Sequence, residues 1–278
     1  MAATFVVTLR EGFEAALLLG IVYACLDRFG ARQHYRLVTL GGALGLVASI
    51  LMAIAVTRLS GPLLDLGPDL VSAAVIFAAV GLLTWHSWWM SRHAQAMRGA
   101  VQRRVEEAEA TRRFWVLGLI AFTGVFREGA ETVLFLWGLL SQSAERASFR
   151  PLGAGVLGVA TAAALGWMVF RGGTRLSVRR FFTVTTVALL LLAAGLFSTG
   201  LGKLQGLGVL PPTEALWDTS FLLSDHGLVG GFATGLVGYR ARPTFVEVVG
   251  YAAYLVVAGG LFLGAAGRAE RGPLPDRP

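Results

Sequence analysis

A five-residue charged motif occurs twice in this chain, each time inside a run of apolar residues. The copies are Arg10-Glu11-Gly12-Phe13-Glu14 and Arg127-Glu128-Gly129-Ala130-Glu131. An ionisable group inside a membrane-spanning helix costs about 2.5–3.5 kcal/mol on insertion scales, so such groups usually mark an ion or proton path. The repeated motif therefore constrains both the fold and the function.

The composition indicates an integral membrane protein. Of 278 residues, 55% are hydrophobic and 15% are charged, and the mean hydropathy is +0.65. The formal charge of +7 comes from clusters between apolar runs, which argues against a nucleic-acid partner. The single cysteine, Cys25, allows neither an internal disulfide nor a thiolate metal cluster. Because Met1-Ala2-Ala3 has no basic residue, we expect the first apolar run to be retained as a span.

Seven apolar runs are long enough to cross about 30 Å of hydrocarbon, which takes about 20 helical residues. They are residues 4–26, 37–57, 69–90, 114–140, 151–170, 181–202 and 244–265. With the N-terminus outside, sixteen of the 24 Lys and Arg residues fall in inner segments and six in outer ones. The positive-inside rule therefore predicts an all-α integral membrane protein with seven transmembrane helices, N-out and C-in.

The motif spacing predicts internal symmetry. The copies are 117 residues apart, and Phe5 and Phe122 each stand five residues before the arginine. The first motif helix runs inward and the other outward, so we expect a 3+3 inverted repeat plus one helix, a common plan of secondary transporters. The single permease domain would then comprise repeat one (about 1–90), a charged, helical inner loop (91–113), repeat two (about 114–202), an outer loop (203–242), and the seventh span and tail (243–278).

Each motif offers two carboxylates and one guanidinium on a helix, and Arg10 can pair with Glu14 four residues later. If the two motif helices meet, the four glutamates and two arginines sum to a formal charge of −2, which calls for a bound cation or for protonation. All-oxygen ligation suits Fe³⁺, Mn²⁺, Ca²⁺ or Mg²⁺, tolerates Fe²⁺ and disfavours Cu⁺. Gly12 and Gly129 would leave space for close backbone approach or for an ion.

Other interpretations of the motifs stay open. A buried salt bridge in each motif would explain one glutamate and leave the second without a partner. A proton relay through the glutamates is chemically reasonable. An intramembrane enzyme with glutamates as acid and base would need a nucleophile or an open metal site, and no His-Glu-x-x-His occurs. A structural subunit of an uptake complex predicts that the glutamates can be neutralised without loss of uptake.

Arg-Glu-Gly-x-Glu in the first and fourth of seven spans resembles the oxidase-dependent iron permease family, which includes fungal high-affinity iron permeases and bacterial inner-membrane iron-uptake permeases. The resemblance covers nearly the whole chain, including Trp217-Asp218 and the segment from Pro243 to Tyr254. It implies a high-affinity iron importer of the cell inner membrane, with iron as the transported substrate and no cofactor. Its implied metal ligands are Glu11, Glu14, Glu128 and Glu131, with Arg10 and Arg127 as supporting charges.

The resemblance also implies a partner, because relatives are thought to receive Fe³⁺ from an oxidase or a periplasmic iron-delivery protein. They are described with an acidic capture motif on an outer loop, whereas Glu106-x-x-Glu109 here falls in the inner loop. Outer capture would then use Glu214, Asp218, Asp225 or His226. Fe³⁺ is the first choice of cargo, Fe²⁺ is compatible with the same ligands, and a permease for Mn²⁺ or Pb²⁺ is the main alternative. The chain is compatible with a homo-oligomer.

Three further features lie near the predicted membrane boundaries. Glu247 either lines the path or forms an interfacial pair with Arg240 or Arg242. His86 stands in a tryptophan-rich stretch near the expected inner end of the third span, which predicts an interfacial packing residue rather than a ligand. The outer loop is semi-apolar and contains Pro211-Pro212, so we expect a short helix or a re-entrant segment over the outer mouth.

Overall fold

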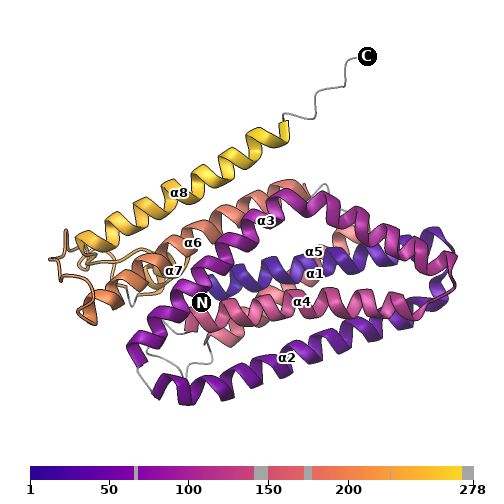
Figure 1. Ribbon diagram of the computed structural model, residues 1–278, viewed down its shortest axis with the longest axis horizontal. Coiled ribbons are helices and arrows are strands. Elements are labelled where there is room, and N and C mark those ends of the chain that lie inside the picture. The colour runs from indigo at the N-terminus through magenta and orange to yellow at the C-terminus, as the bar shows by residue number, and fades with distance from the viewer. Residues whose placement is uncertain (66–67, 141–149, 172–176, 226, 271–278) are drawn as a thin grey trace.

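The computed structural model describes residues 1–65, 68–140, 150–171, 177–225 and 227–270. These residues form helices and connections, with one isolated β-bridge between Ala215 and Thr244. The helices are α1 (Ala2–Arg28), the 3₁₀ helix η1 (Arg32–His34), α2 (Tyr35–Asp65), α3 (Pro68–Ala110), α4 (Trp115–Leu140), α5 (Arg150–Phe170), α6 (Val178–Gly206), α7 (Leu228–Val237) and α8 (Phe245–Glu270). The long helices run back and forth along the long axis of the molecule (Figure 1).

All seven apolar runs predicted from the sequence lie in helices, and α2 and α3 extend furthest beyond their runs. α2 continues to Asp65, and α3 continues through the charged segment to Ala110. The predicted helical inner loop is therefore a direct extension of α3. It ends in a turn where Arg112 adopts a φ of 52°, before α4 begins. The side chains of Glu106 and Glu109 lie outside the described residues.

Within the described residues, five helices are long and apolar enough to cross a membrane: α2, α3, α5, α6 and α8. α1 and α4 have 27 and 26 residues, which is also sufficient length, but each carries the three charges of a motif. The protein is therefore an all-helical membrane protein with several spans. The difference between five and seven spans depends on the two helices that carry the motifs.

The first and second helices of the two predicted repeats exchange partners. α1 packs along α5, and α2 packs along α4. Small residues allow close contact in both pairs, since a Cβ at Gly41 of α2 would collide with the carbonyl oxygen of Gly118 in α4, and a Cβ at Gly158 of α5 would collide with Thr8 of α1. α3 packs on α6, and α6 also contacts α8.

The two ends of the bundle differ in chemistry. At one end, α7 packs against α6 and the start of α1. At the other end, an apolar cluster that includes Leu26, Val38, Val105 and Leu117 holds the last turns of α3 against α1, α2 and α4. The arginines of the α1–α2 connection and of the end of α3 lie at this second end.

The segment between α6 and α8 contains the short helix that the sequence predicted. α7 has ten residues and ends at Val237; it is followed by Gly238, whose φ of 73° favours glycine. α8 then begins with a capping box, in which Glu247 Oε2 accepts from the Thr244 N–H at 2.9 Å and Thr244 Oγ1 accepts from the Glu247 N–H at 3.3 Å. This capping fixes the start of the last long helix.

Candidate metal centre

The first motif lies near the middle of α1, with its charged side chains inside the bundle. Arg10, Glu11 and Glu14 are 1%, 0% and 6% exposed. Arg10 Nε lies 3.1 Å from Glu14 Oε1, and Arg10 Nη1 lies 3.3 Å from Glu11 Oε1. The predicted pairing of residues four apart is confirmed, and a single guanidinium contacts both carboxylates of the motif.

The second motif repeats these ion pairs in a less buried setting on α4. Arg127 Nε lies 3.1 Å from Glu131 Oε1 and 3.8 Å from Glu128 Oε1. The Arg127 side chain is 39% exposed, and its guanidinium lies over the ring of Trp89, 4.9 Å from the centroid. Glu128 is buried. The two motifs therefore share a pattern of contacts but differ in their access to the surroundings.

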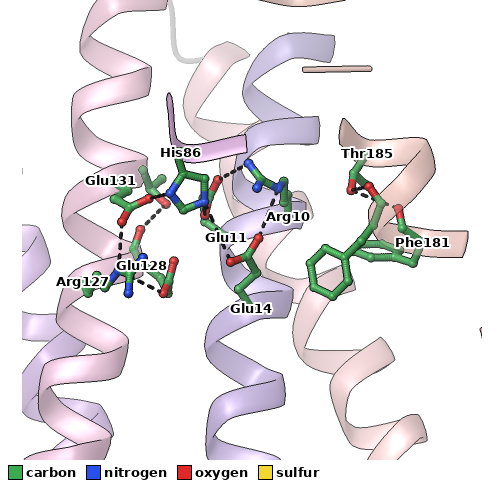
Figure 2. Close-up of polar contacts among 11 residues, drawn as sticks. Arg10, Glu11, Glu14, His86, Arg127, Glu128, Glu131, Phe181 and Thr185 are labelled. Carbon is green, nitrogen blue, oxygen red and sulfur yellow. Dashed lines mark hydrogen bonds and ion pairs between the residues drawn. The ribbon is translucent and has the colours of Figure 1, made fainter. Parts of the chain in front are cut away.

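His86 of α3 lies between the two motifs (Figure 2), buried among glutamates of both. Its side chain is 7% exposed. The Nδ1 atom forms an ion-pair contact with Glu131 Oε2, while Nε2 lies 3.8 Å from Glu11 Oε2 and 3.9 Å from Glu14 Oε2. Because α3 continues to Ala110, residue 86 stands near the middle of the helix and not at its end.

The structure brings the four glutamates and this histidine into one cluster. One ligand atom from each of Glu11, Glu14, His86 and Glu128 can be chosen so that all lie within 4.8 Å of one another. Glu131 joins the cluster through its contact with His86. We call these five residues, with Arg10 and Arg127, the central cluster.

Several buried atoms of the central cluster have no hydrogen-bond partner. They are Arg10 Nε, Glu11 Oε2, Glu14 Oε1, His86 Nε2, Glu128 Oε2 and Glu131 Oε2. Arg10 Nε, Glu14 Oε1 and Glu131 Oε2 have a close ion-pair contact instead, which leaves Glu11 Oε2, His86 Nε2 and Glu128 Oε2. A buried polar atom left in this state costs about 1–3 kcal/mol, and more when it is charged. With His86 neutral, the ionised carboxylates and guanidiniums sum to the formal charge of −2 expected from the sequence. The cluster thus has the oxygen and nitrogen donors, and the negative charge, to hold a cation.

The motif glycines pack against neighbouring helices. A Cβ at Gly12 would lie 3.0 Å from Ala162 Cβ of α5, and a Cβ at Gly129 would collide with Ser49 of α2. These contacts match the predicted close backbone approach. The predicted alternative, space for an ion at these glycines, is not what their surroundings provide.

Glu247 forms the pair with Arg240 that the sequence analysis considered. Its Oε1 lies 2.6 Å from Arg240 Nη1, and its side chain is buried. Arg240 Nη2 donates to Thr199 Oγ1 at 3.0 Å. An open hollow of about 500 Å³ adjoins this pair, lined also by Lys203 and Gln205. We call Thr199, Arg240, Thr244 and Glu247 the outer cluster, because they adjoin the segment that the sequence predicts to be an outer loop.

The other acidic candidates of the 203–242 segment lie apart from the central cluster. Asp218 Oδ2 lies 2.6 Å from Arg242 Nη2, and Asp218 Oδ1 accepts from the Ser220 N–H. These contacts hold the pKa of Asp218 below its usual value. Asp225 Oδ1 accepts from the Ala241 N–H at 2.9 Å. Glu214 is exposed, and His226 lies outside the described residues.

Comparison with known proteins gives a consistent result over almost the whole length. The model of the iron permease FTR1 family matches residues 1–270. The chain is similar to the ferrous iron permease EfeU of Escherichia coli O157:H7, with 31% identity over 261 residues that cover 93% of this chain and 94% of the relative. Its similarity to the ferrous iron permease EfeU of Yersinia pestis is 29% over 265 residues, covering 94% and 93%. No solved structure matches the chain.

Proposed function

Because the chain belongs to the iron permease FTR1 family, we propose that it imports iron by passing the ion through the central cluster between α1, α3 and α4. The family consists of permeases, so the protein is a transporter and not an enzyme. The proposal rests on one observation: Glu11, His86 and Glu128 each have a buried atom that could bind a metal ion and that has no hydrogen-bond partner. Such atoms are tolerated inside a protein when a ligand or an ion satisfies them.

The oxidation state of the cargo is a finer question. An all-oxygen site favoured Fe³⁺, but the central cluster also contains an imidazole, a ligand that suits divalent iron. With all four carboxylates ionised and His86 neutral, Fe²⁺ brings the formal charge of the cluster to zero, whereas Fe³⁺ leaves an excess of one. The relatives are named ferrous iron permeases. We therefore take Fe²⁺ as the ion that occupies the cluster.

We further propose seven spans in the inner membrane, including α1 and α4, with the N-terminus outside and the C-terminus inside. The start of α1 and α7 share one end of the bundle, and the arginine-rich end of α3 is at the other. The positive-inside rule assigns the arginine-rich end to the cytoplasm. The exchange of partners between α1–α5 and α2–α4 is the pairing expected of two inverted three-helix repeats.

Delivery of iron from outside is proposed to involve a partner protein. Asp218, Asp225 and Glu247 are already bound by Arg242, the Ala241 amide and Arg240. Among the described acidic candidates of the outer segment, only Glu214 is left without such a contact. One exposed carboxylate is a weak capture site for an iron ion, so an iron-oxidising or iron-delivery protein would supply what this surface lacks.

Uptake of radioactive iron into proteoliposomes tests the proposed function. Iron would be supplied as Fe²⁺ under reducing conditions or as Fe³⁺, to the native protein and to Glu11→Gln and Glu128→Gln. Glutamine keeps the shape of the side chain and removes its charge. We expect uptake of Fe²⁺ by the native protein and a loss of more than about 100-fold in each variant, since loss of a ligand should exceed the ~10–100-fold effect of a second-sphere change.

Glu107→Gln serves as the matched control, because Glu107 is an exposed carboxylate on the extension of α3. It should transport iron like the native protein. If Glu11→Gln and Glu128→Gln also transport normally, the glutamates are structural charges and the proposed path is wrong. Uptake of Mn²⁺ in preference to iron would instead favour the alternative of a general divalent-cation permease.

A further inference from the structure

The two nitrogens of His86 have different surroundings. Nδ1 contacts Glu131 Oε2. Nε2 faces Glu11 Oε2 at 3.8 Å and Glu14 Oε2 at 3.9 Å, and it has no hydrogen-bond partner (Figure 2). The side chain is more than nine-tenths buried. One nitrogen is therefore held by a carboxylate, and the other is directed at two carboxylate oxygens that it does not reach.

This arrangement fits an ion better than it fits a salt bridge. A protonated Nε2 would need an acceptor within about 3.2 Å, and the nearest carboxylate oxygens are beyond that limit. Two ligand atoms that each lie about 2.1 Å from a metal ion are at most about 4.2 Å apart. The distances from Nε2 to Glu11 and Glu14 fall within that range.

The contacts of Glu131 differ from those of the equivalent Glu14 in the first motif. Glu131 Oε1 is bound by Arg127 and Oε2 forms an ion-pair contact with His86 Nδ1, so each oxygen has a charged or ionisable neighbour. Glu14 Oε1 is paired with Arg10, while Glu14 Oε2 faces the Nε2 side of His86. A histidine that binds a metal usually donates its other N–H to a carboxylate, which fixes the ring and its tautomer.

We propose that His86 Nε2 is a direct ligand of the transported ion, together with Glu11, Glu14 and Glu128, and that Glu131 positions the imidazole instead of binding the ion. The proposal rests on the proposed function, because it assigns the ligands of the same site. It also means that the two motifs, although alike in sequence, do different work: α1 supplies two ligands, and α4 supplies one ligand and one positioning carboxylate.

The test is the detection of nitrogen bound to metal in the purified full-length protein. Mn²⁺ serves as a paramagnetic probe, and protein containing ¹⁵N-labelled histidine is examined by pulsed electron paramagnetic resonance. We expect hyperfine coupling between bound Mn²⁺ and histidine nitrogen in the native protein. In His86→Gln the coupling should disappear and Mn²⁺ binding should weaken more than tenfold. His34→Gln, which alters a histidine stacked on Phe114 outside the cluster, is the matched control and should behave as native.

The variant Glu131→Gln tests whether Glu131 binds the ion or only positions the His86 imidazole. We expect the nitrogen coupling to remain and Mn²⁺ affinity to fall about 10–100-fold, as for other second-sphere changes. Affinity equal to that of the native protein would overturn the role of Glu131. Native protein that binds Mn²⁺ without nitrogen coupling would overturn the role of His86, a result that needs no variant to fold, and would leave the proposed function intact. Native protein that binds neither Mn²⁺ nor Fe²⁺ would overturn both proposals.

Discussion

The central cluster and the outer cluster both contain a buried glutamate paired with an arginine, but they differ in whether the polar atoms have hydrogen-bond partners. In the outer cluster, Glu247 Oε1 is bound by Arg240 and Oε2 by the Thr244 amide, and Arg240 also donates to Thr199. In the central cluster, Glu11 Oε2 and His86 Nε2 have no hydrogen-bond partner. The outer cluster is complete without a ligand, and the central cluster is not.

This difference shows that burial and charge do not by themselves identify a binding site. Glu247 and Glu11 are both buried acidic residues in an apolar helix. What separates them is whether each oxygen has a donor in the folded chain, because a buried charge with a full set of partners is a stable structural element. The comparison therefore predicts opposite effects on stability and transport in the two clusters.

The largest effect on stability is expected from Arg10→Met. Arg10 is buried and contacts two carboxylates, so its loss should lower the free energy of unfolding by about 3–5 kcal/mol, as for other broken buried pairs. Arg127→Met removes the same contacts at a half-exposed position and should cost about 1 kcal/mol or less. Denaturant unfolding in detergent would compare them, and equal losses would show that burial does not distinguish the two motifs.

The next effect separates the two clusters directly. Glu247→Gln should lower the free energy of unfolding by about 1–3 kcal/mol, because Arg240 loses its charged partner, while iron uptake per folded molecule stays within about twofold. Glu11→Gln should lose uptake without losing stability, because the substitution removes a buried charge that is only partly compensated. Thermal unfolding and proteoliposome uptake measure both quantities. Loss of uptake in Glu247→Gln with normal folding would place the outer cluster on the ion path.

A smaller effect is expected from Thr244→Ala. Loss of the hydroxyl that accepts from the Glu247 N–H should cost about 1 kcal/mol, the usual value for a helix N-cap. Thr244→Ser, which keeps the hydroxyl, is the control and should retain most of the stability. A native-like melting temperature for the alanine variant would mean that the Thr244 hydroxyl does not stabilise the start of α8.

The smallest effect concerns pH and the exposed pair of Asp218 and Arg242. Hydrogen bonds from Arg242 and Ser220 lower the pKa of Asp218 in the folded protein. The stabilisation is thus complete above the unfolded pKa of about 3.9 and is lost as the pH falls through the lower folded value. Hydrogen exchange at the Ser220 amide, corrected for intrinsic rates, should show protection at pH 5 that weakens only below about pH 3.9. In Asp218→Asn this dependence should be absent.

Much of the fold and of the candidate site was predictable from local sequence. The seven helices follow from apolar runs, and the pairing of Arg10 with Glu14 follows from their spacing. The position of His86 could not be predicted in this way, because the apolar run ends near residue 90 while the helix continues to Ala110. The helix-forming character of the charged segment was the signal that α3 continues beyond its apolar run, so that His86 lies near the middle of a long helix.

The sequence also did not predict which helix packs against each glycine. Gly41 and Gly158 predict that some helix comes close, but their spacing does not say which one. The role of Glu247 was partly readable, since Thr244-x-x-Glu247 is a capping-box pattern. Recognising this capping box requires the exact first residue of α8, and hydropathy does not locate helix ends with that precision.

The exchange of partners between the repeats limits how the protein can move. Because α1 is packed along α5, and α2 along α4, each tight pair contains one helix from each half of the sequence. The halves are interlocked, so one cannot rock against the other without separating helices at their closest contacts. The α1–α5 pair and the α2–α4 pair are then natural rigid bodies. Glu11 and Glu128 belong to different pairs, so sliding of one pair past the other would change the distance between these carboxylates and could release an ion held between them.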